Sequence, residues 1–364
     1  MAIWIWPQFW ERLVKPKIRL SVEILDPIVD KGAPVNVRCT IINESYLPCP
    51  RVHCSIRLPQ QLESNLPDRV EFVEFSTYVW ARQKTDVTFT LKSVKRGYGK
   101  IVQGDFMFID GFGLRKFYHT IPLSVGVVVR PTPVAPTQTP IRLLDLLGDV
   151  RTQRFYNEDP SLLLGIRPYQ AGDPFKYISW LTTARSQQLM VKQFGYTTTA
   201  RCLIILSGQF DNPFWLGVNE TLFDLLCTRV LQMTEQLLQA GIAVGLYTNM
   251  YDNMSHTHFE PPASANWQLE KIRTRMGAIE FPSFSLADAL QHIPHYTSNG
   301  DLVILVTGYW DDAVAARCAQ LQQSRRSLHV YLLNDAHIHP HQISQFPIYV
   351  ESPSQVSYES VSVR

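Results

Sequence analysis

The sequence predicts a multidomain chain in which an all-β sandwich precedes an α/β domain with a doubly wound parallel sheet. Two observations support this prediction. Residues 17–130 consist of short strand-like runs separated by turn residues, whereas residues 200–352 alternate apolar strands with amphipathic helices. The chain has 364 residues, which is enough for two or three domains with separate cores.

The first segment, residues 1–16, is rich in tryptophan. Aromatic residues followed by cations are typical of a membrane interface, and no apolar run approaches the ~20 residues of a spanning helix. The alternative is a terminal element whose aromatic side chains cover the neighbouring domain. The residues that would contact lipid are Trp4, Trp6, Phe9 and Trp10.

Residues 17–130 contain runs such as "PVNVRCTIIN" and "RVEFVEFSTYVW", in which apolar and polar residues alternate. About seven such strands, separated by turns, predict an immunoglobulin-like β-sandwich, with a closed barrel as the alternative. The proline-rich residues 131–140 follow and are expected to form an extended, exposed linker.

Residues 200–352 predict the α/β domain. A long amphipathic helix ends at Gly241, and Ser285 caps a later helix. Alternating strands and helices favour parallel strand pairing with right-handed crossovers. Residues 141–199 form a separate signature segment before this domain, and residues 353–364 form a C-terminal tail.

Composition excludes several classes of protein. Hydrophobic residues make up 45% and charged residues 18%, which is typical of a globular chain. A formal charge of +2 gives no field suited to nucleic acid. The 6 cysteines form no C-x-x-C motif, so we expect reduced thiols in a cytoplasmic protein.

Ligands of doubly wound sheets bind at the carboxyl ends of the strands. The loops expected there read "LSGQFDN", "YTNMYDN" and "VTGYWDD", and none contains a nucleotide-binding or hydrolase motif. We expect these loops to form a docking surface, although Asp311 and Asp312 could instead begin the next helix. The residues assigned to the surface are Ser207, Gln209, Asp211, Thr307, Tyr309, Trp310 and Asp311.

This order of elements resembles the von Willebrand factor A fold, which often binds a divalent cation through an Asp-x-Ser-x-Ser loop. Here Ser207 stands where the leading Asp should be, and Gly308 follows Thr307 where Asp is common. Mg²⁺ requires hard anionic oxygens. We therefore expect no metal or cofactor, and the alternative is a metal-dependent adhesion module that uses Asp211.

The signature segment contains "RPYQAGDPFKYISWLTTAR", residues 167–185. Asp173 followed by Pro174 is a strong start signal, so we expect one helix over residues 174–185. Arg185 would end this helix favourably for its dipole. Residues 189–194 then predict a strand.

This segment also resembles the family called domain of unknown function 58 (DUF58). The positions that match its pattern are Arg167, Tyr169, Gly172, Asp173, Ile178, Trp180, Ala184, Arg185 and Lys192. The run from Lys95 to Phe117 is similar to the family's Arg-Gly motif and to a later turn. The family is typically bacterial, has no established catalytic activity and is similar to partners of MoxR-type AAA+ ATPases.

The resemblance implies a non-enzymatic adaptor, in the cytoplasm or peripheral at the inner face of the membrane. The arginines of the signature allow two interpretations. Arg167, Asp173 and Arg185 could form an ion network that fixes the helix while Tyr169 and Trp180 fill space. Alternatively, Arg167 and Arg185 could face outward and bind an acidic peptide or a phosphate. An unrecognised hydrolase is a further alternative.

Overall fold

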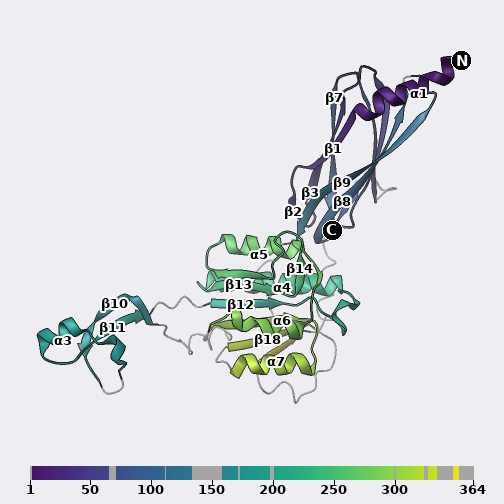
Figure 1. The fold of residues 1–364 in the computed structure, drawn as a ribbon. Coiled ribbons are helices and arrows are strands. Elements are labelled where there is room, and N and C mark those ends of the chain that lie inside the picture. The colour runs from purple at the N-terminus through teal and green to yellow at the C-terminus, as the bar shows by residue number, and fades with distance from the viewer. Residues whose placement is uncertain are drawn as a thin grey trace.

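The computed structural model describes residues 2–64, 71–110, 112–132, 158–170, 173–196, 201–298, 301–323, 327–333 and 347–351. Figure 1 shows a β-sandwich joined to an α/β domain, with a small third unit beside them. The predicted order of an all-β region followed by a mixed α/β region is confirmed. The predicted tail, residues 353–364, lies outside the described residues.

The sandwich has two sheets, ordered β1-β3-β7-β5 and β2-β9-β8-β4-β6. The strands of the first sheet are β1 (Ile18–Ile24), β3 (Pro34–Asn43), β7 (Lys84–Ser93) and β5 (Leu62–Ser64). Those of the second are β2 (Ile28–Asp30), β9 (Lys116–Arg130), β8 (Gly97–Ile109), β4 (Cys49–Arg57) and β6 (Phe72–Val79). The helix α1 (Ala2–Val14) and the 3-10 turn η1 (Lys15–Lys17) precede them.

Alternation along the strands builds the core of the sandwich. In β3 every second residue is buried, so Cys39 and Ile41 face the opposite sheet. Cys54 of β4 and Phe106 of β8 belong to the same core. A slip of one residue would expose this whole set, and the pattern therefore fixes the register of the strands.

The α/β domain is built on one sheet of order β15-β13-β12-β17-β18-β19, in which β15 is antiparallel. Its strands are β12 (Arg201–Leu206), β13 (Ala243–Thr248), β15 (Phe259–Ala263), β17 (Leu302–Thr307), β18 (Ser327–Leu333) and β19 (Ile348–Glu351). A small pair, β14 (Met250–Asp252) and β16 (Ile279–Pro282), lies beside it.

Helices cover both faces of this sheet, as a doubly wound fold requires. One core contains side chains of α4 (Glu220–Gln239) and α5 (Trp267–Ala278). The other contains side chains of α6 (Leu286–His292) and α7 (Asp312–Gln323). Two predicted helix boundaries are confirmed. Gly241, with φ +79°, follows the C-terminus of α4. At the N-terminus of α6, the Ser285 hydroxyl accepts the Asp288 N–H.

The signature segment forms a small unit of two antiparallel strands, β10 (Glu158–Pro168) and β11 (Met190–Tyr196). The single helix predicted over residues 174–185 is wrong. A 3-10 turn, η3 (Phe175–Tyr177), is followed by the short helix α3 (Trp180–Ser186). Helical backbone is interrupted because Ile178 is extended, with ψ 128°, and forms a β-bridge with Val191.

The two large domains meet at Arg96, which lies between β7 and β8. Its guanidinium donates to Asp224 of α4 at 2.5 Å and to the main-chain oxygen of Met276 in α5 at 2.6 Å. The same group lies 4.7 Å from the ring centroid of Phe223. The Arg96 side chain is only 7% exposed, so its hydrogen bonds are shielded from water. Since the forked guanidinium bonds to α4 and α5 at once, it holds both helices against the sandwich.

Other ion pairs surround this contact and are more exposed. Arg130, at the end of β9, pairs with Asp30 and with Glu270 of α5, each at 2.7 Å. Exposed pairs of this kind each stabilise a fold by roughly 0–1 kcal/mol. The buried Arg96 and the similarly buried Arg273, which pairs with Asp30 at 3.0 Å, therefore contribute more to the junction than the exposed pairs do.

The end of the sandwich is packed closely against α5. A Cβ on Gly277 would lie 2.7 Å from the Val128 side chain, so only glycine allows this approach. Arg273 donates to the main-chain oxygen of Pro131 at 3.1 Å. Pro131 is consequently buried, although the sequence predicts it as the first residue of an exposed linker. Residues 133–140 of that linker lie outside the described residues.

We expect the Arg96→Ala variant to lose about 2 kcal/mol of unfolding free energy, because charge-assisted hydrogen bonds are removed and a buried carbonyl loses its donor. Arg57, exposed on β4, supplies a matched control whose Ala variant should change by less than about 0.5 kcal/mol. Urea denaturation followed by tryptophan fluorescence measures both. Equal losses in the two variants would contradict the role of Arg96.

Candidate functional site

The carboxyl ends of β12, β13 and β17 meet at one edge of the sheet, as expected for parallel strands. The loops that follow them contain the predicted docking residues. Ser207 and Thr307 are 0% exposed and Gln209 is 3% exposed. This burial corrects the expectation that these three side chains lie on a docking surface.

Gln209 crosslinks two loops at this edge. Its side-chain oxygen accepts a hydrogen bond from the N–H of Leu286, the first residue of α6, at 2.7 Å. Its amide nitrogen donates to the main-chain oxygen of Asp211 at 3.0 Å. The Ser207 hydroxyl accepts the Gln209 N–H at 3.2 Å. The polar atoms that could have bound a ligand are thus used within the protein.

Two apolar side chains fill the rest of the edge. A Cβ on Gly208 would lie 2.1 Å from the Met250 sulfur, and a Cβ on Gly308 would lie 2.2 Å from the Phe210 ring. Close packing of this kind leaves no room for a larger residue at either glycine. Gly308, which stands where the von Willebrand factor A pattern commonly has Asp, makes room for an aromatic ring instead of supplying a carboxylate.

The loop after β17 has its own hydrogen-bond network. The Tyr309 hydroxyl donates to one carboxylate oxygen of Asp311 at 2.8 Å, and the other oxygen accepts the Val314 N–H at 2.8 Å. Burial and this carboxylate raise the pKa of Tyr309 to about 12. Asp311 thus caps the start of α7, and this role corrects the prediction that Asp311 belongs to the docking surface. The Trp310 side chain in the same loop is half-buried.

An exposed apolar cluster lies beside the closed edge. Trp215 and Leu216, in the 3-10 turn η4 (Phe214–Leu216), are 70% and 62% exposed, and Phe281 of β16 is 51% exposed. The turn η4 contacts β16, and the Tyr251 ring stacks on Phe281 at 5.4 Å. We call Trp215, Leu216, Phe281 and Tyr251 the rim patch. Sequence reasoning missed it, although the aromatic pair after Pro213 was a visible signal.

The signature unit contains one strong ion pair. Arg167 donates to both carboxylate oxygens of Asp173, at 2.7 and 2.8 Å, and the Gln170 N–H donates to one of them. The Arg167 guanidinium and the Gln170 amide hold the pKa of Asp173 below its usual value. Arg167 is therefore paired rather than free to bind a phosphate. Gly172 lies outside the described residues.

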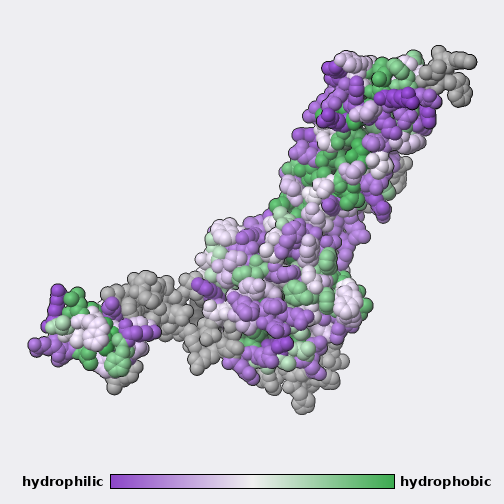
Figure 2. Space-filling view, viewed as in Figure 1, coloured by the Kyte–Doolittle hydropathy of each residue, from purple (hydrophilic) through white to green (hydrophobic). Residues whose placement is uncertain are grey.

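The other signature residues divide between packing and exposure. Tyr169 stacks on Phe175 at 5.8 Å between ring centroids. Trp180 is 68% exposed, which corrects the expectation that it fills space. Arg185 and Lys192 are exposed, and Arg185 forms no ion pair with a described residue. Figure 2 shows hydrophobic and hydrophilic residues side by side on this unit.

Aromatic residues of α1 contribute to the sandwich core. Trp10 is 1% exposed, its ring stacks on Phe117 at 5.4 Å, and its Nε1 donates to the main-chain oxygen of Pro48 at 3.4 Å. This packing corrects the predicted contact of Trp10 with lipid. The Trp4 side chain lies outside the described residues.

Apolar residues remain exposed near α1. Phe9 is 52% exposed, and the half-buried Trp6 lies 5.0 Å from the ring of Phe112, which is 71% exposed. Leu114 is 51% exposed. Across the described ranges, no helix has the length and apolar character needed to cross a membrane.

The cysteines are free and buried. Burial raises the pKa of Cys49, Cys227 and Cys318 to about 12, so these thiols stay protonated and unreactive. Among the residues that the structure describes, no group of three His, Cys, Asp or Glu side chains could hold a metal ion.

Comparison with known proteins supports part of the family resemblance. Residues 165–330 match the family model described as "Protein of unknown function DUF58". This match includes most of the signature unit and most of the α/β domain. No curated protein matches the chain.

Two solved structures with distant similarity to part of the chain illustrate the comparison. The CARDB domain of the PF1109 protein from Pyrococcus furiosus, in complex with di-metal ions, is 11% identical with a TM-score of 0.21 and covers 30% of this chain and 93% of its own. The alkylpurine DNA glycosylase AlkC of Pseudomonas fluorescens is 7% identical with a TM-score of 0.19, over 30% of each chain. Neither similarity carries an argument about function.

Proposed function

We propose that this chain is a non-enzymatic adaptor that binds a protein partner through the rim patch. One observation carries the proposal: the strand-end edge is filled by its own side chains, while Trp215, Leu216 and Phe281 beside it are exposed. Exposed aromatic residues are the side chains that most often anchor protein interfaces. Because the strand-end edge is filled, the domain would recognise a partner through the shape and the apolar area of the rim patch.

The partner that we propose is a MoxR-type AAA+ ATPase, acting with this chain in the assembly or maturation of a protein complex. The resemblance to DUF58, supported over residues 165–330, is the basis for this partner. The sheet order β15-β13-β12-β17-β18-β19, with helices on both faces, supports the further proposal that the second domain has the von Willebrand factor A fold.

The geometry disfavours the metal-dependent adhesion module. Cation sites need several oxygen ligands that converge on one point. Here the Ser207 hydroxyl bonds to its own loop, the Thr307 hydroxyl donates to the Tyr309 carbonyl oxygen, and Asp211 is exposed. The same closure disfavours a hydrolase at this edge, because a substrate would have to displace Gln209, Met250 and Phe210.

The signature unit supplies a second contact in this proposal. Trp180 and Leu181 are 68% and 70% exposed on α3, and the exposed cations Arg185 and Lys192 belong to the same unit. An apolar surface flanked by cations suits a partner segment that carries apolar and acidic residues. Arg167 and Asp173 hold the fold of the unit and take no direct part.

A double variant tests the rim patch. We expect Trp215→Ser with Leu216→Ser to weaken binding to the purified MoxR-type AAA+ ATPase of the same organism by at least about tenfold, because central aromatic anchors contribute about 2 kcal/mol or more. The variant Trp180→Ser should weaken binding by a smaller factor. Isothermal titration calorimetry with the full chain measures each affinity.

Trp267 of α5 provides the control, because it is 57% exposed on the same domain and lies outside the rim patch. The variant Trp267→Ser should bind as the parent does. Unchanged binding by the double variant, or an equal loss in the control, would refute the rim patch as the docking surface.

We also propose that the end of the sandwich near α1 touches the cytoplasmic face of a membrane. The exposed residues Phe9, Phe112 and Leu114 support this contact, and the cation Arg12 is exposed on α1 beside them, whereas Lys15 pairs with Glu11. Aromatic side chains beside cations favour the interface of an anionic bilayer.

Vesicle sedimentation tests the membrane contact. We expect the chain to sediment with vesicles that contain phosphatidylserine, and Phe9→Ser with Phe112→Ser to reduce the bound fraction several-fold. Trp267→Ser, at a residue 57% exposed on α5 and therefore far from α1, is the control. Sedimentation that is insensitive to the double variant would exclude this surface.

A further inference from the structure

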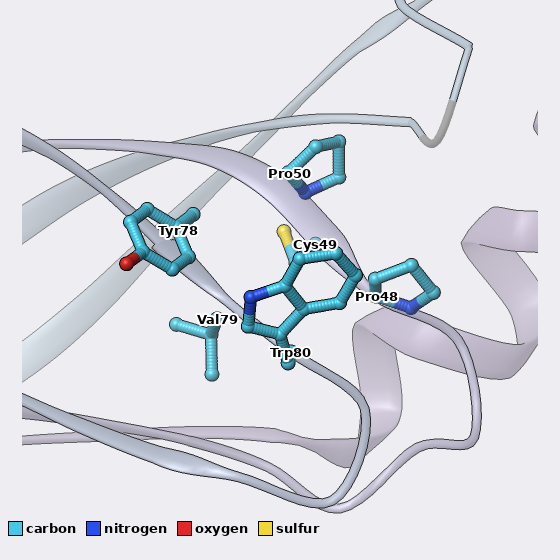
Figure 3. A pocket seen from close by; sticks show the side chains of 6 residues that line it. All are labelled: Pro48, Cys49, Pro50, Tyr78, Val79 and Trp80. Carbon is cyan, nitrogen blue, oxygen red and sulfur yellow. The ribbon is translucent and has the colours of Figure 1, made fainter.

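A cavity of about 460 Å³ lies in the sandwich between the start of β4 and the end of β6 (Figure 3). Its volume falls within the roughly 300–1,000 Å³ that is typical of ligand sites. The lining residues are Pro48, Cys49, Pro50, Tyr78, Val79 and Trp80. None of them carries a charge, so the cavity suits neither a phosphate nor an acidic group.

A β-bulge creates the cavity. Cys49 of β4 pairs with Val79 of β6, but the next pair is Val52 with Thr77, which leaves Pro50 and Arg51 opposite Tyr78 alone. β6 is the edge strand of its sheet, so the cavity opens outward.

The cavity has an apolar floor and aromatic walls. Cys49 and Val79 are 0% and 1% exposed and form the floor, whereas Tyr78 and Trp80 are 61% and 58% exposed. Figure 3 shows the Trp80 ring beside Pro48 and below Pro50, with its indole nitrogen on the Tyr78 side. Within the described part of the chain, the Trp80 N–H and the Tyr78 hydroxyl have no hydrogen-bond partner.

A buried asparagine fixes the two sides of the cavity. Asn43 is 0% exposed, and its side-chain nitrogen donates to the main-chain oxygens of Leu47 at 2.9 Å and Trp80 at 3.2 Å. Trp10 of α1 donates to the main-chain oxygen of Pro48 at 3.4 Å. The backbone that carries the walls is therefore fixed at Pro48 and Trp80 before any ligand binds, and a fixed backbone lowers the entropic cost of binding.

We propose that this cavity binds a proline-rich segment of a partner protein in the polyproline II conformation. Such a segment has no internal hydrogen bonds, so its carbonyl oxygens are free to accept from Trp80 Nε1 and the Tyr78 hydroxyl. Its proline rings would pack on the aromatic faces and on Pro48 and Pro50. A stiff segment also loses little conformational entropy on binding. This site is independent of the rim patch.

Fluorescence anisotropy of labelled decaproline with the full chain tests the proposal. We expect decaproline to bind at least about tenfold more tightly than a Gly-Ser decamer of equal length, because the flexible peptide must be ordered. Trp80→Ala should weaken binding more than about tenfold. Tyr78→Phe removes only one hydrogen bond, so a loss of about fivefold is expected.

The exposed aromatic Tyr118 of β9 lies outside the cavity and supplies the matched control, Tyr118→Ala, which should bind as the parent does. Tyr78→Phe keeps the ring and the fold, and a loss in that variant separates recognition from misfolding. Equal affinity for the two peptides would overturn the proposal. So would unchanged binding in both Trp80→Ala and Tyr78→Phe.

Discussion

The contact of Arg96 with α4 and α5 joins two domains that have separate hydrophobic cores. A guanidinium that is almost wholly removed from water must have its donors used, and here the Asp224 carboxylate and the Met276 main-chain oxygen accept from it. The Phe223 ring lies against the same cation. The two domains are thus held as one body. Figure 1 shows the consequence: α1 lies at the far end of the sandwich, and the α/β domain lies at the near end.

The strand-end edge of the α/β domain is closed by side chains of the domain itself, and this closure determines what the domain is suited to bind. Open sheets of this type commonly bind ligands where Gln209, Met250 and Phe210 lie here. Gln209 and Phe210 come from the loop after β12 and Met250 begins β14, and these side chains occupy space or polar groups that a ligand would otherwise need. Recognition is left to the exposed side chains beside the edge, so the domain is suited to binding a protein.

Much of the fold was predictable because its determinants are local. Alternation along β3, the glycine after α4 and the Ser285 cap are short-range signals, and each gave the correct element. The site depended on distant contacts that no local pattern reports. Gln209 bonds to Leu286, 77 positions away, and a bridge to Val191 kept Ile178 out of the predicted helix. Likewise, no periodicity shows that Trp180 stays exposed or that Trp10 is buried.

In the α/β domain the strand-end edge is closed and the surface beside it is open. Thiol labelling measures this directly, because all the native cysteines are buried. We expect a cysteine placed by Trp215→Cys to react about as fast as a free thiol. One placed by Ser207→Cys should react at least about a hundredfold more slowly, because it becomes accessible only when the fold opens. Equal labelling rates at the two positions would contradict the closure of the edge.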